Sequence, residues 1–158
     1  MWPKGGTSLR ISRENIDVEL MLARPMSPNV YAAMAFSDDQ KMGNDLVFAC
    51  SPSWMSESPT VYAFLNKEGT TPSELLNRND RMNIIQKSGT SSYVNSFFTC
   101  YFTLETNATV KGIVFDFKKG HYILLATGPA GKANLSYHGT NKVASKSKFE
   151  INDNQTGR

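Results

Sequence analysis

The sequence predicts an all-β protein, an antiparallel sandwich or barrel, from three observations. Short apolar or alternating runs recur along most of the 158 residues. Gly, Asn, Asp and Pro separate these runs, as expected for turns between antiparallel strands. No helical pattern continues beyond one or two turns, which excludes a helical bundle and favours a sheet-on-sheet architecture.

The predicted strands follow the chain in order, and two of them have distinctive patterns. Residues 16–22 at first alternate apolar and polar side chains, as in a strand with one buried face. Residues 30–36 are nearly all apolar, which predicts a strand buried on both faces. A helical turn is expected at 72–79, where Pro72 precedes a helix-like pattern. Further strands are expected at 46–50, 60–65, 82–86, 93–105, 110–117, 122–127 and 148–151.

The composition indicates one soluble globular domain. Hydrophobic residues make up 40% and charged residues 20%, which is ordinary for a folded domain of this length. We expect the domain over residues 12–152, with loosely held tails at 1–11 and 153–158. The net charge of +3 does not indicate a nucleic-acid partner. The spaced lysines Lys142, Lys146 and Lys148 indicate a solvated strand or loop, with a docking surface for an acidic partner as the alternative.

No stretch approaches the roughly 20 apolar residues that a membrane-spanning helix needs. The first residues also lack the apolar core of a signal peptide. We therefore expect the chain as given to be soluble, although it can be part of a longer, membrane-anchored parent.

Two cysteines and three glycosylation sequons bear on the compartment. Cys50 and Cys100 lie in apolar, strand-like runs and form either a disulfide between two strands or two buried thiols. The sequons begin at Asn107, Asn134 and Asn154, in polar, turn-like segments. Three sequons and an even cysteine count favour a secreted or luminal location.

The sequence lacks the motifs of the common hydrolases and phosphoryl-transfer enzymes. Its two histidines, His121 and His138, do not have the spacing of a zinc enzyme. No nucleophile elbow and no phosphate-binding loop occurs. Asp38, Asp39 and Asp45 share one connection, but their spacing differs from that of a calcium loop and favours a solvated acidic turn.

Met42 is the candidate functional residue that stands out from its surroundings. Methionine usually fills gaps in apolar cores, which accounts for Met21 and Met34 within strands. Met42 instead lies in a polar connection beside Lys41 and Gly43. A thioether there is a candidate axial ligand to haem iron, with a histidine as its partner, because His/Met ligation is common in electron-transfer haem proteins.

Three segments resemble DOMON domains, in particular those of ferric-chelate reductase homologues. Residues 31–47, YAAMAFSDDQKMGNDLV, are similar to a strand and methionine-bearing loop of these domains. Residues 98–103, FTCYFT, are similar to their cysteine-bearing strand. Residues 121–138, from HYILLATGP to LSYH, are similar to the penultimate strand and the histidine that follows it. The resemblance covers residues 16–151.

The resemblance implies an immunoglobulin-like antiparallel β-sandwich that binds haem b between two axial ligands. By position these ligands are Met42 and His138, since His138 follows the bend at 126–128 where the family ligand falls. His121 is then a strand-edge histidine. The resemblance also implies a disulfide between Cys50 and Cys100.

The resemblance further implies a one-electron relay to ferric chelates on the extracellular or luminal face of a membrane. The expected partner is a transmembrane cytochrome b module of the same parent chain, while the isolated domain is expected to be a soluble monomer. The alternative is a haem-free DOMON domain that binds a sugar or catechol-like ligand or mediates protein contacts.

Overall fold

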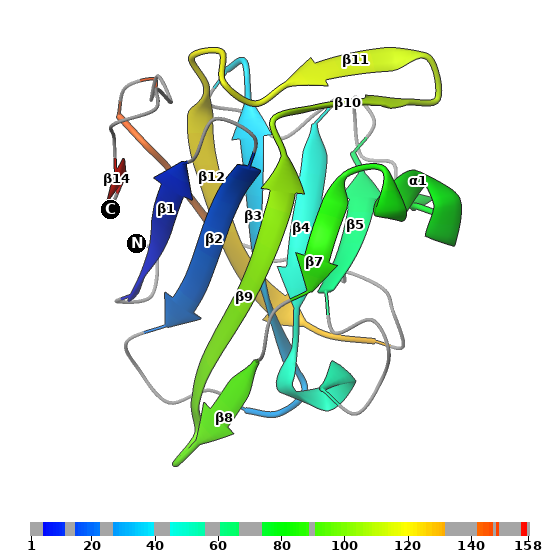
Figure 1. Ribbon diagram of the computed structural model, residues 1–158. Coiled ribbons are helices and arrows are strands. Elements are labelled where there is room, and N and C mark those ends of the chain that lie inside the picture. Colours follow the sequence, from blue (N-terminus) through cyan, green and yellow to red (C-terminus); the bar gives the residue numbers. More distant parts are fainter. Residues whose placement is uncertain are drawn as a thin grey trace.

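Two antiparallel sheets face each other in this computed structural model, which confirms the predicted all-β sandwich (Figure 1). The structure describes residues 5–11, 15–22, 27–39, 45–55, 61–66, 74–88, 91–131, 142–146, 148 and 156–157. Labels below follow Figure 1, and every paired strand is antiparallel to its neighbour.

The first sheet has the order β14-β1-β2-β9-β7, with β8 also paired to β9. Its strands are β1 (Gly5–Ile11), β2 (Asn15–Leu22), β7 (Ile85–Ser88), β8 (Ser92–Val94), β9 (Phe97–Glu105) and β14 (Thr156–Gly157). The second sheet has the order β13-β12-β3-β4-β5-β6. Its strands are β3 (Val30–Ser37), β4 (Leu46–Cys50), β5 (Val61–Leu65), β6 (Glu74–Leu75), β12 (Tyr122–Pro129) and β13 (Lys142–Ala144).

A separate hairpin of β10 (Asn107–Val110) and β11 (Ile113–Asp116) lies across one end of the sandwich (Figure 1). We call this end the hairpin end. Strand β3 ends there, and β4 and β12 begin there, because Phe36 pairs with Leu46 and Ser37 pairs with Tyr122. The short helices η1 (Pro52–Trp54) and α1 (Arg78–Met82) lie outside the sheets.

The main core fills the space between the two sheets. Alternate residues of β9, including Phe98, Phe102 and Leu104, are at most 2% exposed. Across the interface, Phe48 of β4 lies 5.6 Å from the Phe102 ring, measured between ring centroids. Each such buried side chain contributes roughly 1.5–3 kcal/mol to folding, so this layer accounts for much of the stability.

Strand β3 is buried on both faces, as its apolar sequence predicted. Ala32, Met34 and Phe36 belong to the core between the sheets. The alternate residues Tyr31, Ala33 and Ala35 belong to a second apolar cluster. Because successive side chains of a strand point to opposite faces, this second cluster covers the outer face of the second sheet.

The disulfide between Cys50 and Cys100 is confirmed, and it joins the two sheets. Cys50 ends β4 in the second sheet, while Cys100 lies in β9 of the first. Their Cα atoms are 6.6 Å apart, which is within the range that a disulfide spans. Both residues are fully buried.

Several predicted boundaries differ from the structure. The helical turn expected at 72–79 lies later, at Arg78–Met82, where Asn77 caps its first turn by accepting a hydrogen bond from the Asp80 amide. The strand expected at 82–86 therefore begins only at Ile85. Of the strand expected at 148–151, only Lys148 lies within the described residues, and it has no regular structure.

Two strands expected to be continuous are hairpins instead. A turn at Asn95 and Ser96 separates β8 from β9, and both residues have positive φ, 51° and 66°. A turn at Lys111 and Gly112, with φ of 50° and 79°, separates β10 from β11. Two successive residues with positive φ are typical of the type I′ turns that match the twist of a hairpin.

The described parts of both predicted tails belong to the first sheet. Strand β1, within the tail expected at 1–11, pairs with β2 along its whole length. Thr156 and Gly157, within the tail expected at 153–158, pair with Arg10 and Leu9. Among the described residues, no helix is long and apolar enough to span a bilayer.

Replacing both disulfide cysteines with alanine is expected to lower the free energy of unfolding by about 4 kcal/mol. The cysteines are 50 residues apart, and the chain-entropy model gives this value for opening a loop of that length. Urea denaturation of the wild type and of the Cys50→Ala/Cys100→Ala variant measures the difference. A reducing agent should destabilise the wild type alone; equal unfolding midpoints without reductant contradict the prediction.

Gly128→Ala is expected to destabilise the chain by about 1–3 kcal/mol, the usual cost of overpacking. A Cβ atom at Gly128 would lie 2.8 Å from Cε2 and from the hydroxyl oxygen of the buried Tyr31 ring. Thermal unfolding of Gly128→Ala, Tyr31→Leu and the double variant tests this cause. Because the shorter Leu side chain removes the clash, the double variant should lose less stability than the sum of the single variants. Additive losses would show that the ring is not responsible.

Candidate functional site

Met42 lies in the connection between β3 and β4, outside the described residues. The described residues that flank this connection are Asp39 and Asp45, both at the hairpin end. Asp39 is held by Ser37, whose hydroxyl oxygen accepts a hydrogen bond from the Asp39 amide at 3.3 Å. Asp45 accepts a hydrogen bond from the Asn66 amide through its carbonyl oxygen at 2.9 Å. Both ends of the Met42 connection are therefore anchored to the second sheet.

His138 lies in the connection between β12 and β13, also outside the described residues. The flanking described residues are Gly131 and Lys142. The Gly131 carbonyl oxygen accepts a hydrogen bond from Trp54 Nε1 at 3.0 Å, at the end of the sandwich opposite the hairpin. Lys142 pairs with Ala126, halfway along β12. Strands β13, β12, β3 and β4 are consecutive neighbours, so both candidate ligands belong to connections of one four-strand region.

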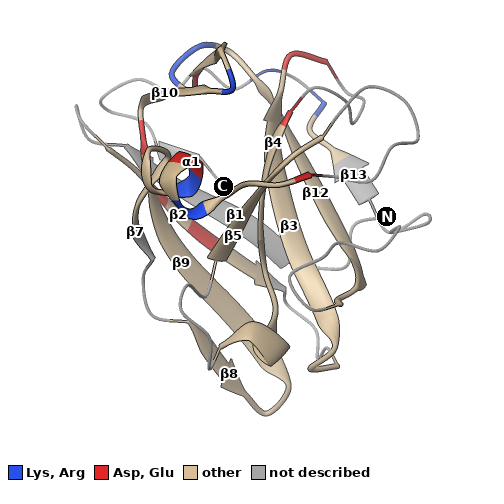
Figure 2. Cartoon of the chain, turned by 90° about the vertical axis from the view of Figure 1, so that its right-hand side faces the viewer, with Lys and Arg blue, Asp and Glu red and all other residues tan. Residues whose placement is uncertain are grey.

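The outer face of this region carries the second apolar cluster. Its floor consists of small or β-branched residues, Ala33 and Ala35 of β3 with Val47 and Ala49 of β4, all at most 2% exposed. Strands β3, β4, β5 and β12 contain no charged residue and are tan throughout in Figure 2. The cluster therefore forms an apolar layer next to the connections that carry Met42 and His138.

Larger aromatic residues border the cluster away from the hairpin end. Trp54 packs edge-on against Tyr62, with ring centroids 5.4 Å apart. Tyr31 is 2% exposed, and burial raises the pKa of its phenol to about 12. The phenol is therefore neutral at physiological pH. The nearly all-apolar run 30–36 predicted a second buried face, but the contribution of Trp54 depends on η1 and was missed.

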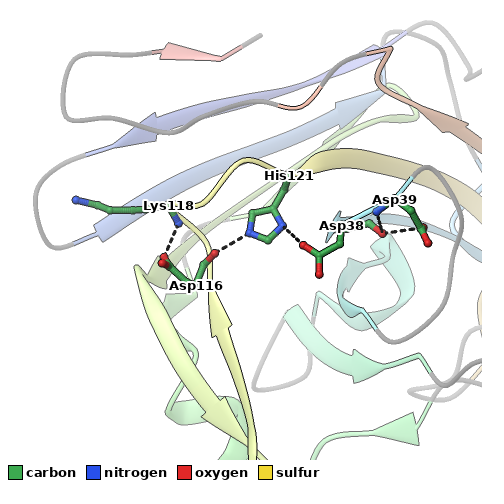
Figure 3. A network of polar contacts seen from close by, with 6 residues as sticks. Asp38, Asp39, Asp116, Lys118 and His121 are labelled. Atoms are coloured by element: carbon green, nitrogen blue, oxygen red, sulfur yellow. Dashed lines mark hydrogen bonds and ion pairs between the residues drawn. The ribbon is translucent and has the colours of Figure 1, made fainter.

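His121 lies at the hairpin end, immediately before β12, and the structure brings it to the Met42 connection (Figure 3). Its Nε2 atom lies 2.6 Å from the carbonyl oxygen of Asp116, and its Nδ1 atom lies 3.7 Å from Asp38 Oδ1. The residue is 9% exposed and its ring packs edge-on against Phe36. Nδ1 itself is buried and has no hydrogen-bond partner in the part of the chain that the structure describes.

The acidic residues of the β3–β4 connection have different environments. The Asp38 side chain is 76% exposed, as expected for a solvated turn. Asp45 is only 5% exposed, so the prediction of a solvated acidic turn does not hold for this residue. Within the described ranges, no three His, Cys, Asp or Glu side chains gather into a group that could hold a metal ion.

Of the predicted sequons, only Asn107 falls on described residues, and it is exposed at the start of β10. Asn134 and Asn154 lie outside them.

Lys142 is the first residue of β13, and Lys148 places its ammonium 5.7 Å from the centre of the Tyr122 ring.

Comparisons with known proteins give weak similarity to one group of reductases. No family model matches the chain. It is 30% identical over 120 residues to "Putative ferric-chelate reductase 1 homolog" of Drosophila melanogaster, covering 73% of this chain and 17% of that protein. It is 26% identical over 121 residues to "Putative ferric-chelate reductase 1" of Danio rerio, covering 77% of this chain and 20% of that protein. The chain thus spans about a fifth of the length of these relatives.

Proposed function

We propose that this chain is a DOMON domain that binds haem b between Met42 and His138 and relays single electrons. The observation that carries the proposal is topological. The connections with Met42 and His138 belong to four neighbouring strands of one sheet, whose outer face is apolar. The names of the two relatives add ferric-chelate reduction as the parent activity.

The lengths of the two connections are compatible with a shared ligand. His138 precedes Lys142 by four residues, which reach at most about 14 Å when extended. Lys142 pairs with Ala126, and four strand residues, about 13 Å, separate Ala126 from the start of β12 at the hairpin end. Met42 follows Asp39 by three residues at that same end. Both side chains are therefore within reach of one group.

The apolar outer face would give a bound macrocycle dry surroundings. Alanine side chains at positions 33, 35 and 49 are at most 1% exposed, because the chain itself covers them, and no charge interrupts the strands. Apolar surroundings keep water away from a haem iron. The layer would therefore lie beside the haem, while the two connections would supply the donors.

Haem, when bound, exchanges one electron between its ferric and ferrous states. Met42 would supply a thioether and His138 an imidazole nitrogen to hold the iron, which would leave it no position for oxygen. Softness of the thioether raises the reduction potential.

The proposed setting is the extracellular or luminal face of a membrane. The Cys50–Cys100 disulfide and the exposed Asn107 sequon support an oxidising compartment. In this setting a cytochrome b module elsewhere in the parent chain supplies electrons, and ferric chelates accept them. The isolated domain is proposed to be a soluble monomer.

His121 is the specific alternative to His138 as the haem ligand. Histidines that bind metals commonly donate their other ring N–H to a backbone carbonyl, as His121 Nε2 does to Asp116. The remaining nitrogen, Nδ1, is buried without a hydrogen-bond partner at the hairpin end. We favour His138 because a haem iron is normally bound through Nε2, which is already engaged in His121.

Absorption spectra of the purified chain with added hemin test the ligand pair. Wild type should show a sharp Soret band and, after reduction, split α and β bands, because both axial positions are occupied. Met42→Ala and His138→Ala should each lose this six-coordinate spectrum. The matched controls are Met82→Ala, at an exposed methionine of α1, and His121→Gln, and both should keep it.

The outcomes separate the competing functions. Wild-type protein without a Soret band would refute haem binding and favour a haem-free domain that binds sugars, catechols or proteins. If haem binds but only His121→Gln loses the spectrum, the axial histidine is His121. If neither Met42→Ala nor His138→Ala changes the reduced spectrum, the proposed ligand pair is wrong.

The Asn107 sequon provides a separate test of the compartment. Chain secreted from eukaryotic cells should carry a glycan at Asn107, because this side chain and that of Thr109 are exposed. Thr109→Ala removes the sequon and should abolish the glycan, whereas Thr109→Ser keeps both. Mass spectrometry of the glycopeptide before and after enzymatic deglycosylation measures occupancy; an unmodified Asn107 in secreted wild type contradicts the prediction.

A further inference from the structure

We propose that His121 Nδ1 and the Asp38 carboxylate form a two-ligand site for the transition-metal ion of the electron acceptor. The ion is substrate, delivered in a small chelate that keeps some of its own ligands. This inference rests on the proposed function, in which His138 and not His121 binds haem.

The tautomer of His121 follows from its neighbours. The Asp116 carbonyl oxygen can only accept a hydrogen bond, and it lies 2.6 Å from Nε2, so Nε2 carries a proton. In the neutral ring the lone pair is then on Nδ1. That atom is buried, has no hydrogen-bond partner among the described residues, and faces Asp38 Oδ1 at 3.7 Å (Figure 3).

Two electron-pair donors therefore face each other across 3.7 Å. A metal ion bound at about 2.1 Å from each donor would lie slightly off the line that joins them, since the donors are 3.7 Å apart. Imidazole with carboxylate is a donor set that suits iron, zinc, copper and nickel. The Asp116 carbonyl acts on the metal only through the ring, whose tautomer and orientation it fixes.

The surroundings favour a metal ion that binds transiently over one that stays bound. The described residues offer no third His, Cys, Asp or Glu to complete the coordination. The Asp38 side chain is 76% exposed, so a chelate can approach its carboxylate from solvent. Remaining coordination positions stay with the chelator, which allows release after reduction. Asp38 precedes Met42 by four residues, which places the site close to the proposed haem.

A proton on Nδ1 is the competing occupant, because an imidazolium would form an ion pair with Asp38. Among the described residues, the polar groups that contact the ring are the Asp38 carboxylate, just after β3, and the Asp116 carbonyl from β11. Asp116 Oδ1 accepts a hydrogen bond from the Lys118 amide at 3.0 Å and is turned to that contact. If His121 and Asp38 form only an ion pair, the protein should show no metal affinity that depends on both residues.

The test uses the haem-free full chain and Co²⁺ alone as a paramagnetic probe, followed by nuclear magnetic resonance. Co²⁺ should selectively shift or broaden signals from His121 and Asp38. Asp38→Asn is expected to weaken Co²⁺ binding about tenfold or more, since loss of even an outer-shell partner costs 10–100-fold. His121→Gln should abolish binding. Asp39→Asn is the matched control and should leave the affinity unchanged.

The outcomes are distinct from those of the hemin spectra. Absence of selective effects at His121, or equal affinity in the wild type and Asp38→Asn, overturns the metal site whatever the haem result. If Co²⁺ binds as expected but hemin does not, the metal site stands and the proposed haem relay fails. In haem-loaded protein that has been reduced beforehand, each ferrous haem can pass one electron to one ferric chelate. Asp38→Asn should raise the chelate concentration that gives half the maximal rate of haem reoxidation and leave the haem spectrum unchanged; an unchanged half-saturating concentration would overturn its role as a substrate site.

Discussion

The burial of β3 on both faces is the constraint on which the rest of the structure depends. Its inward residues complete the core between the sheets, and its outward residues complete the apolar cluster on the other side. One strand therefore links the part of the molecule that gives stability to the part proposed to hold haem. A polar residue at Ala33 or Ala35 would disturb the outer layer, and one at Met34 would disturb the core.

Local sequence predicted β3 and β4 well because both are apolar runs bounded by turn residues and, at eight and five residues, have the length of strands. It predicted α1 poorly, because Asn77 was not recognised as a helix cap and the Pro72 signal lay too early. The hairpin turns at 95–96 and 111–112 were missed for a different reason. Only the second contains a glycine, and the Asn95-Ser96 turn adopts positive φ without one. Strand β1 was missed because its pattern of Gly, Ser and Thr resembles a tail, and pairing with β2 determines its structure.

The sequence likewise indicated some features of the candidate site and not others. Met42 stood out locally because an apolar side chain interrupted a polar connection. The environment of His121 depends on residues from β11 and the end of β3, which only the fold brings together. The disulfide followed from the family resemblance, and the structure confirmed it by placing both cysteines at facing positions of two sheets.

The position of that disulfide along the sandwich has a mechanical consequence. Cys50 is the last residue of β4 and Cys100 lies in the first half of β9, both away from the hairpin end. The covalent link therefore restrains the two sheets away from the hairpin end. At the hairpin end, where Asp38 and His121 lie, non-covalent packing holds the layers together, including the contacts of Phe117 with Phe36 and Phe48.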